Sequence, residues 1–541
     1  MTGPTSSYEF LPSERPSFPG SPFTPRLSLP RRLGYAAIAL LVGVTATLGN
    51  ALVNVNLAAI AGSAGMYVVE ASWLPAIYVA FNASANLMLV KARAQFGIPR
   101  VVITVLGLYA ATAALQLIFP VYLGAVAVRA ASGLAAAALT TYTVYHLIEA
   151  LPPAKRAGAL AIGIVIPQLG TPLARMLPVE LLTTHQWRGI HLIELATALF
   201  CIAATVALPL PPTERSKVFS RLDVLTMGLL LPANVMLCGF LSLGRLLWWV
   251  DATQLALLLC GAIVCYVAAY LLERHRRAPL LQMRWITTKD ILRFAAVAIF
   301  VRLALAEQTY EAVGLLASGG LINDQLAGLF AWVALAMIVG IGVVLVLLSQ
   351  QRLPYLVMAA SLTIAVGAIL DSHSNALSRP AQLYASQMLL GLGTALFMGP
   401  ALLYGLMHMR SQGPNFLVSF VVLFSTTQNI GGLAGSAILG TLQTIQTRVH
   451  ATSMATHLTS ANPAIAAQLH EGAAGFAGVL TDPVARQLAG GRLLGQALNT
   501  QAAAAAYDDV FALVAVFALG TALYVGVATW STRYVRRDRN A

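Results

Sequence analysis

The residues best suited to chemistry lie in one apolar stretch near residue 300. Five polar or charged residues interrupt it: Arg302, Glu307, Gln308, Tyr310 and Glu311. Glu307 and Glu311 are four positions apart, so on a helix they share one face. Burial favours the neutral form of a carboxylate, and a second carboxylate nearby favours it further. The pattern predicts a proton or cation site at Glu307, with a structural role as the alternative; Glu311 also fits a wet residue at the helix mouth.

Two further charged residues lie inside apolar stretches. Arg129 is in the middle third of the stretch 122–149, and Glu194 is early in 189–210. Charged side chains are costly in lipid, so they are candidates for function by default. We expect Arg129 to face a central cavity and to have water, a carboxylate or a backbone carbonyl as its partner. Glu194 is a second candidate for proton coupling.

Amide side chains form stripes at helical spacing. Tyr78, Asn82 and Asn86 follow each other at intervals of four, and Asn50 and Asn54 repeat that spacing. Such stripes act either as hydrogen-bonding contacts between helices or as the lining of a pore. The residues that we take as candidates for a substrate cavity are Asn50, Asn54, Tyr78, Asn82, Asn86, Gln308, Gln428 and Asn429.

Helix-breaking residues lie inside two apolar stretches. Pro167, Gly170 and Pro172 fall within 157–183, and Gly431, Gly432 and Gly435 fall within 414–442. Proline bends a helix, and glycine lets two backbones approach closely. Bent, closely packed helices suit a protein that alternates between two conformations, although static bundles contain them too. We treat the three residues near 170 as a conformational motif.

The composition defines the class of protein that carries these residues. Of 541 residues, 58% are hydrophobic and only 10% are charged, and the mean hydropathy is +0.76. A soluble globular chain carries about 25% charged residues, so this composition is typical of an all-α membrane protein with many spans. The four cysteines lie in apolar stretches without C-x-x-C spacing, which argues against structural disulfides and a zinc site.

Fourteen apolar stretches are long enough to cross a bilayer, at roughly 20 residues each. They are 34–61, 68–92, 100–120, 122–149, 157–183, 189–210, 222–244, 249–272, 294–317, 325–348, 353–371, 381–407, 414–442 and 509–533. An even count puts both termini on one side, and most of the 33 lysines and arginines fall on that side. The positive-inside rule therefore predicts cytoplasmic termini. The net charge of +13 then reflects topology and contact with anionic lipid rather than binding of nucleic acid.

Two segments stand outside this pattern of spans. Residues 1–33 are rich in Pro, Ser and Arg without helical periodicity, which predicts a disordered arm. Residues 443–508 are long, rich in Ala and Gln, and fall on the side away from the termini. Loops of this length are usually functional or disordered, so the segment is either a flexible excursion or a docking surface for a partner.

Several local motifs, in order along the chain, resemble those of one transporter family. They are Leu52-Val53-Asn54-Val55 followed by Ile60-Ala61-Gly62, Trp73 with Tyr78, Arg129-x-x-x-Gly133, Pro152 to Arg156, Pro167-x-x-Gly170, Trp187-Arg188, and Gly391 to Pro400 before a glycine-rich span and a long loop. Together they resemble the fourteen-span drug:proton antiporter branch of the major facilitator superfamily, especially the Emr-type multidrug efflux pumps. The resemblance runs from about residue 34 to 533.

The resemblance implies an architecture and a set of partners. The expected fold has two six-helix bundles, 34–210 and 288–533, with two inserted helices at 219–274 and a cytoplasmic tail at 534–541. The expected function is proton-coupled export of small amphipathic or aromatic compounds across the inner membrane. Its partners are the small-molecule substrate, protons and membrane lipid, and in diderm bacteria a periplasmic adaptor and an outer-membrane channel. In that family the arginine that Arg129 matches is implicated in proton coupling.

The chain departs from the family pattern at three places. Gly49 stands where the first span normally has an acidic residue. Ala94 stands where the loop after the second span has an aspartate, and Ala174-Arg175 replaces two glycines in the fifth span. Because Gly49 cannot titrate, proton coupling must use another acid or be absent. We therefore assign the proton to Glu307, with Glu311 as a relay and Glu194 as the competing candidate.

Other functional classes remain as alternatives. An enzyme would need a catalytic constellation, and the sequence contains no H-E-x-x-H and no G-x-S-x-G motif. No cofactor or metal is expected. An exporter of one dedicated metabolite, and a passive or non-proton-coupled transporter, are the two alternatives to multidrug export.

Overall fold

The computed structural model describes residues 14, 21–25, 27–276, 279–410, 416–458 and 462–540, and helices occupy most of the described residues of each predicted span. The helices of the first half are α1 (Leu29–Val55), α2 (Leu57–Ser63), α3 (Val68–Phe96), α4 (Ile98–Ile118), α5 (Tyr122–Ala150), η2 (Pro153–Lys155), α6 (Arg156–Gly163), η3 (Ile166–Leu169), α7 (Gly170–Met176) and α8 (Val179–Ala207). Two helices follow, α9 (Arg221–Leu247) and α10 (Thr253–Arg274). Strand pairing among the described residues is limited to an isolated bridge between Pro22 and Thr213.

The second half contains longer and more interrupted helices. They are α11 (Met283–Ile286), α12 (Lys289–Ala304), η4 (Glu307–Glu311), α13 (Ala312–Ser318), η5 (Asn323–Leu326), α14 (Ala327–Leu347), α15 (Leu353–Asp371), η6 (Pro380–Leu383), α16 (Tyr384–Arg410), α17 (Leu417–Thr456), α18 (Pro463–Ala474) and α19 (Pro483–Asn540). The segment η4 is a π-helical turn, whereas η2, η3, η5 and η6 are short 3-10 turns.

Twelve helical segments of the described chain are long and apolar enough to cross a membrane. The two predicted spans outside this set are 294–317, which is interrupted after Ala304, and 414–442, which begins among residues outside the described part. The multi-pass helical architecture is therefore confirmed, and the count of fourteen stays a prediction. Large apolar side chains on the outer face of α10 are exposed, as expected where a helix faces lipid: Leu257, Ile263, Val264, Val267 and Leu271.

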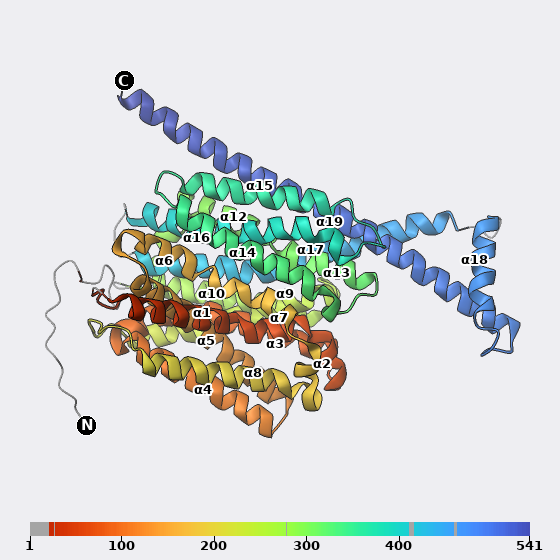
Figure 1. Ribbon diagram of the computed structural model, residues 1–541, viewed down its shortest axis with the longest axis horizontal. Helices are drawn as coiled ribbons and strands as arrows, with labels where there is room; N and C mark the ends of the chain where they lie inside the picture. Colours follow the sequence, from red (N-terminus) through yellow and green to blue (C-terminus); the bar gives the residue numbers. More distant parts are fainter. Residues whose placement is uncertain are drawn as a thin grey trace.

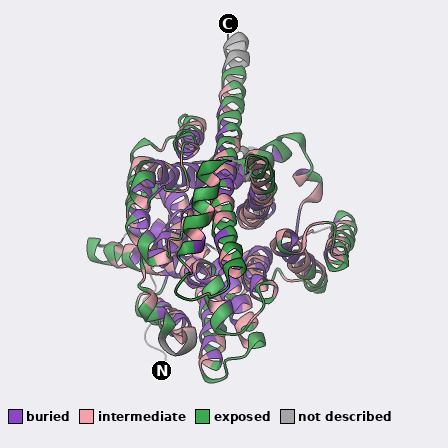
Figure 2. Ribbon diagram, turned by 90° about the vertical axis from the view of Figure 1, so that its right-hand side faces the viewer, coloured by how far each residue is buried: buried purple, intermediate pink, exposed green. Residues whose placement is uncertain are grey.

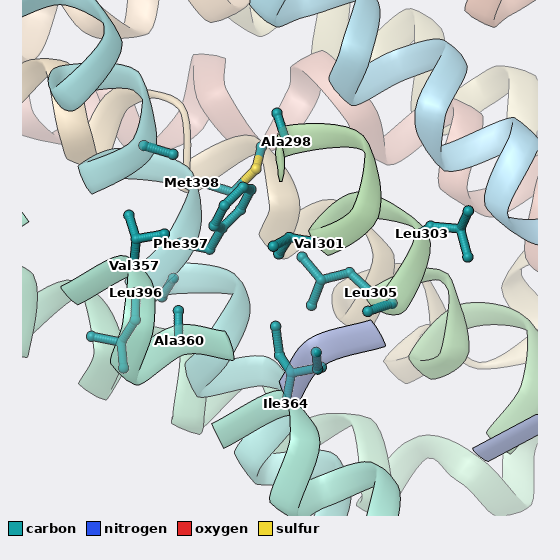
Figure 3. Close-up of a cluster of buried hydrophobic side chains, with 14 of the residues drawn as sticks. Ala298, Val301, Leu303, Leu305, Val357, Ala360, Ile364, Leu396, Phe397 and Met398 are labelled. Carbon is teal, nitrogen blue, oxygen red and sulfur yellow. The ribbon is translucent and has the colours of Figure 1, made fainter. Parts of the chain in front are cut away.

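The helices group into two halves with the α9–α10 pair beside them. In the first half α5 packs on α1, α3 and α4, and α4 packs on α8; in the second half α15 packs on α16 and α19, and α12 packs on α17. The two halves occupy opposite sides of the bundle in Figure 1, and buried residues lie inside while exposed ones face outward in Figure 2. The interior of the second half is a cluster of aliphatic and aromatic side chains from α12, α15 and α16, part of which Figure 3 shows.

The predicted loop 443–508 is mostly helical in its described residues, with a turn between Ala474 and Pro483. Helix α17 continues to Thr456, α18 follows, and α19 begins at Pro483, so the three form an extension that projects from one end of the bundle (Figure 1). His450 Nε2 lies 2.7 Å from Asp509 Oδ2, which places α17 beside α19 near the base of the extension. The alanine-rich composition that suggested a loop also has the highest helix propensity.

The predicted arm 1–33 lies mostly outside the described residues. Several of its described residues contact the rest of the chain. For example, Phe23 N donates to Pro212 O over 3.1 Å, Pro22 forms the bridge to Thr213, and Arg32 Nε donates to Ala150 O over 2.8 Å. Helix α1 begins at Leu29, before the predicted start of the first span, and α19 ends at Asn540. The start of α1 and the end of α19 lie at the same end of the bundle, opposite the extension (Figure 1).

Ionic contacts attach the α9–α10 pair to the first half. Asp223 in the first turn of α9 accepts from Lys91 Nζ of α3 and from Arg276 Nη2 after α10, each over 2.7 Å. Arg276 Nη1 also donates to Glu273 Oε1 of α10 over 2.5 Å. Helix α9 packs along α3 and also contacts α17, so it touches both halves from the side.

Asp223→Ala should lower the free energy of unfolding by about 3 kcal/mol, because it leaves two cations without the buried carboxylate that holds them. Thermal unfolding of the purified protein in detergent measures this loss. The control is Asp290→Ala, which removes an exposed carboxylate 3.7 Å from Arg293 and should change stability by less than about 0.5 kcal/mol. Equal midpoints for the two variants would contradict the role of Asp223.

Candidate functional site

A cavity of about 820 Å³ lies between the two halves. Its lining comes from α1, α3, α5, α6 and η3 of the first half, from α14, α15, α16 and α17 of the second, and from the segment before α1 through Ser21, Pro22 and Thr24. It reaches the helix ends at Glu149 and Ser349, so it opens at the end of the bundle where α1 begins and α19 ends. Among the described residues that line it, none belongs to α9 or α10, which agrees with their place beside the halves.

Amide and hydroxyl groups connect the two halves at the cavity wall. Asn82 Nδ2 of α3 donates to Asn429 Oδ1 of α17 over 3.2 Å. One turn along, Asn86 Nδ2 donates to Ser425 Oγ over 2.8 Å. All four side chains line the cavity, and Gln428 lines it next to them. The stripe on α3 therefore acts both as lining and as a contact between helices, which the sequence left as alternatives.

Four other candidates for the cavity lie outside its lining. Tyr78 donates its hydroxyl to Ala46 O of α1 over 3.1 Å, so its polar atom is occupied within the first half. Gln308 Nε2 donates to Gln387 O of α16 over 2.9 Å. Asn54 is exposed at the end of α1, and Asn50, one turn earlier, is also absent from the lining. The regular spacing of Asn50 and Asn54 described one helix face, but that face does not turn toward the cavity.

The charged residues of the cavity were not among our candidates. Arg93, Glu149, Lys155 and Arg156 all line it. Arg93 Nη1 donates to Tyr145 Oη over 2.6 Å, whereas both carboxylate oxygens of the buried Glu149 lack a hydrogen-bond partner among the protein atoms. These residues lie at the ends of predicted spans, where charge is ordinary, so only the fold shows that they line the cavity.

The predicted conformational motif forms a break between α6 and α7. The helix ends at Gly163 and resumes at Gly170, with Pro167 in the turn between them and Pro172 buried in α7. Pro167 lines the cavity, and its carbonyl oxygen accepts from Thr47 Oγ1 of α1. A Cβ atom at Gly170 would lie 3.0 Å from the backbone nitrogen of Leu48, so glycine permits this close approach of α7 to α1.

The opposite end of the bundle is closed by contacts between the halves. Arg175 of α7 donates from Nη1 to Asn323 Oδ1 over 2.8 Å, and its guanidinium carbon lies 4.9 Å from the centre of the Phe330 ring. Leu169 of the first half packs into a cluster with Phe330 and Leu316 of the second. Arg175 is one of the positions where this chain departs from the family pattern, and here it bridges the halves.

Arg129 and Glu194 form a buried ion pair in the first half. Both side chains are inaccessible to solvent, at 1% and 0% exposure, and Arg129 Nη2 contacts Glu194 Oε1. Arg129 Nη1 also donates to Gly49 O over 3.2 Å, and His191 Nδ1 lies 2.9 Å from Glu194 Oε2. Arg129 is not among the cavity-lining residues, so it lies behind the cavity wall rather than facing it as expected.

The carboxylate of Glu194 occupies the space beside Gly49. A Cβ atom at Gly49 would lie 2.7 Å from Glu194 Oε1 and 2.5 Å from the Tyr109 hydroxyl. A side chain at position 49 and the present position of Glu194 therefore exclude each other. Glu194 of α8 thus fills the space beside Gly49, a contact that the sequence did not show because 145 positions separate the two residues.

Glu307 and Glu311 lie in the second half, away from the cavity lining. Both are fully buried in the π-helical turn η4. Gln387 Nε2 of α16 donates to Glu307 Oε1 over 3.0 Å and also to Asp371 Oδ2 of α15 over 2.7 Å. Sequence reasoning missed both partners, because Asp371 is the last residue of a predicted span and Gln387 is a neutral amide near the start of another.

Arg129→Ala should lower the free energy of unfolding by about 3–5 kcal/mol, because Glu194 then stays buried without its cation. The double variant Arg129→Met/Glu194→Leu removes both charges and should recover most of this loss. Thermal unfolding in detergent, with the four states of the cycle, measures the coupling between the two residues. Independent, additive losses would show that the two side chains do not form a working pair.

Comparisons with known proteins concern the fold. No family model and no curated protein matches the sequence. Solved structures do match: the human organic anion transporter MFSD10 (TETRAN) is 13% identical, with a TM-score of 0.52 over 91% of this chain and 100% of that one. A bacterial homologue of the human drug peptide transporters PepT1 and PepT2 is 11% identical, with a TM-score of 0.56 over 93% of this chain and 99% of that one.

The structure of tetrameric PepTSo2 gives a similar result, at 11% identity and a TM-score of 0.53 over 93% of this chain and 99% of that one. The twelve apolar helices and the two packed halves agree with these matches. The likeness covers more than nine-tenths of this chain in each case. The chain is therefore a multi-pass membrane protein with the major facilitator fold.

Proposed function

We propose that the protein is a proton-coupled secondary transporter that exports small amphipathic or aromatic compounds across the bacterial inner membrane. The observation that carries this proposal is the cavity between the halves, open at one end and closed at the other by Arg175 and the cluster around Phe330. A site between two halves that is open to one side at a time is the geometry that alternating access requires. In this proposal 34–210 and 288–533 are the two moving bundles, and both termini lie in the cytoplasm.

The chemistry of the lining supports amphipathic substrates. Apolar side chains such as Met398, Leu402 and Phe424 lie next to the amides of Asn82 and Gln428. An apolar wall with a few polar groups accommodates compounds that combine an aromatic body with hydrogen-bonding groups. Methionine adapts its shape to different ligands, which favours multidrug export over a pocket dedicated to one metabolite.

Proton coupling is assigned to acids that lie behind the cavity wall. Glu194 is paired with Arg129 and His191, and Glu307 is bridged to Asp371 through Gln387. We keep the sequence-based preference for Glu307, with Glu311 as a relay, because no cation neutralises Glu307 in the described structure through an ion pair. Glu194 is the competing site, but Arg129 stabilises its ionised form and so opposes uptake of a proton there.

The transport test uses everted membrane vesicles and a panel of anionic, neutral and cationic amphipathic compounds. An imposed pH gradient, acidic inside, should drive accumulation of part of the panel, and a protonophore should abolish it. Arg129→Ala, scored per folded molecule, should abolish the gradient-driven component. Accumulation that ignores the gradient would instead identify a passive or non-proton-coupled transporter, and accumulation of a single compound would identify a dedicated exporter.

The two candidate acids are separated in the same assay. Glu307→Gln should abolish the pH dependence of transport, and Glu311→Gln should weaken it, because the amide keeps the shape but cannot release a proton. Asp290→Asn, an exposed acid at the start of α12, is the control and should transport as the wild type does. If Glu194→Gln removes coupling while Glu307→Gln does not, the coupling site is in the first half.

We further propose that the helical extension, which comprises the end of α17, α18 and the start of α19, contacts a periplasmic adaptor that leads to an outer-membrane channel. The extension exposes several large apolar side chains: Val449, Leu458, Val479, Val484 and Leu488. It projects from the end of the bundle that the proposed topology places outside the inner membrane (Figure 1). Exposed apolar residues at such a place are typical of a contact with another protein.

Replacing residues 456–500 with a short Gly/Ser linker should reduce cellular drug resistance more than it reduces transport in vesicles. The cut keeps the His450–Asp509 contact and the buried residues from Ala502 onward, so the membrane part retains its packing. Resistance in intact cells and accumulation in vesicles are compared for the same variant. An equal loss in both assays would indicate that the extension supports folding rather than an adaptor contact.

A further inference from the structure

A group of buried carboxylates in the second half has an arrangement that a single titrating acid does not explain. We propose that Glu307 and Asp371 together form one proton-binding site, held by the side-chain amide of Gln387. The proposal rests on the proposed function in one respect: it names the pair that would hold the coupled proton. Proton binding at the pair is itself independent of any substrate.

The geometry places two carboxylates on one amide group. Gln387 Nε2 donates to Glu307 Oε1 over 3.0 Å and to Asp371 Oδ2 over 2.7 Å. The two acceptor oxygens are therefore at most about 6 Å apart. Glu307 is 0% exposed and Asp371 is 2% exposed. The two hydrogens of the Gln387 NH₂ group thus bind one buried acid each.

The surroundings do not supply a positive charge to balance two ionised carboxylates. In the described chain, neither Glu307 nor Asp371 forms an ion pair with Lys, Arg or His. Arg302 is the arginine nearest to Glu307 along the chain, and it donates instead to Gln428 O of α17 over 3.0 Å. Two buried carboxylates at this separation cannot both stay ionised, so one proton belongs to the pair.

The other titratable groups near η4 belong to a separate arrangement. Arg245 of α9 lies 5.0 Å from the centre of the Tyr310 ring and interacts electrostatically with Glu311 and with Tyr507 of α19. The cation of this region therefore lies against Tyr310, and it forms no ion pair with Glu307 or Asp371 in the described chain.

Unsatisfied atoms in the site provide an independent indication. Glu307 Oε2 and Gln387 Oε1 are buried and have no hydrogen-bond partner among the protein atoms. A carboxylate oxygen and an amide oxygen both accept hydrogen bonds, so the site has two acceptors and lacks a donor. A proton on one of the carboxylates supplies an O–H donor, which an ionised pair does not contain.

The backbone at this place links the site to the closed end of the bundle. Glu307 begins a π-helical turn, a form that is rare and frequent at functional sites. Helix α13 follows at once, and its Ala312 and Leu316 pack with Leu169 and Phe330 in the cluster that closes the cavity. Binding of one proton lets α15, α16 and η4 pack together, and its release leaves two carboxylates that repel each other. The repulsion acts directly on the segment that leads to the closed end.

The test measures proton binding on the purified full-length protein in detergent, without substrate and without a gradient. Infrared difference spectra, recorded as pH is changed, follow the C=O band of protonated carboxyl groups, and a pH indicator counts the protons released. Glu307→Gln and Asp371→Asn should each abolish one titrating band and one proton. The double variant should lose no more than either single variant, because both residues share that proton.

Three controls separate the pair from its surroundings. Glu311→Gln should change a different part of the spectrum. Combined with the double variant Glu307→Gln/Asp371→Asn, it should lower the number of released protons further. Asp290→Asn, far from the pair in an exposed position, should leave spectrum and proton count as in the wild type. Glu307→Asp and Asp371→Glu keep two carboxyl groups and should retain a titrating band, so they report on the pair even where an amide variant unfolds.

An Asp371→Asn variant that retains the full proton count, or losses that add between Glu307→Gln and Asp371→Asn, would overturn the shared site. Failure of the proposed transport function appears elsewhere, as the absence of gradient-driven accumulation in vesicles. The two failures are therefore distinguishable, because the spectra are recorded without substrate.

Discussion

The ion pair between Arg129 and Glu194 is the interaction on which the first half depends. A guanidinium stays charged at every accessible pH, so an arginine buried inside a bundle requires a partner before the surrounding helices can pack. Here the partner comes from α8, a backbone carbonyl comes from Gly49 of α1, and His191 supports the carboxylate from the same helix. Three helices are thereby fixed around one charge, and Gly49 leaves the space that the carboxylate needs.

The second half buries three acids, Glu307, Asp371 and Glu311. Arg302 of the same half donates to a carbonyl oxygen of α17. None of these three acids forms an ion pair in the described chain, whereas Glu194 of the first half is paired with Arg129. An unpaired buried carboxylate favours its protonated form, so these acids can change their charge more readily than Glu194 can. Glu149 of the first half, whose carboxylate oxygens also lack a partner, resembles them in this respect.

The sequence predicted the helices well because lipid imposes a simple length and polarity rule on each span. It also indicated Arg129, Glu194 and Glu307, because a charged residue inside an apolar stretch can be recognised from the sequence alone. Contacts between residues far apart in the sequence were not visible. Asp371 and Gln387 lie near the ends of predicted spans, and only the fold brings them to Glu307. The stripe of Asn82 and Asn86 faces the cavity while Asn50 and Asn54, at the same spacing, do not. Spacing defines a helix face, and only packing decides where that face points.

The contacts between the halves are weaker at the cavity wall than at the closed end. At the cavity wall the halves are joined by neutral amide and hydroxyl bonds, Asn82 to Asn429 and Asn86 to Ser425. A neutral hydrogen bond contributes about 1 kcal/mol net, so these contacts can open and reform. At the closed end Arg175 adds a charge-assisted bond and a ring contact to an apolar cluster. Opening that end exposes apolar surface and a buried cation, and therefore needs a second event to drive it. A change of charge next to α13 is such an event, because the same short helix belongs to the apolar cluster.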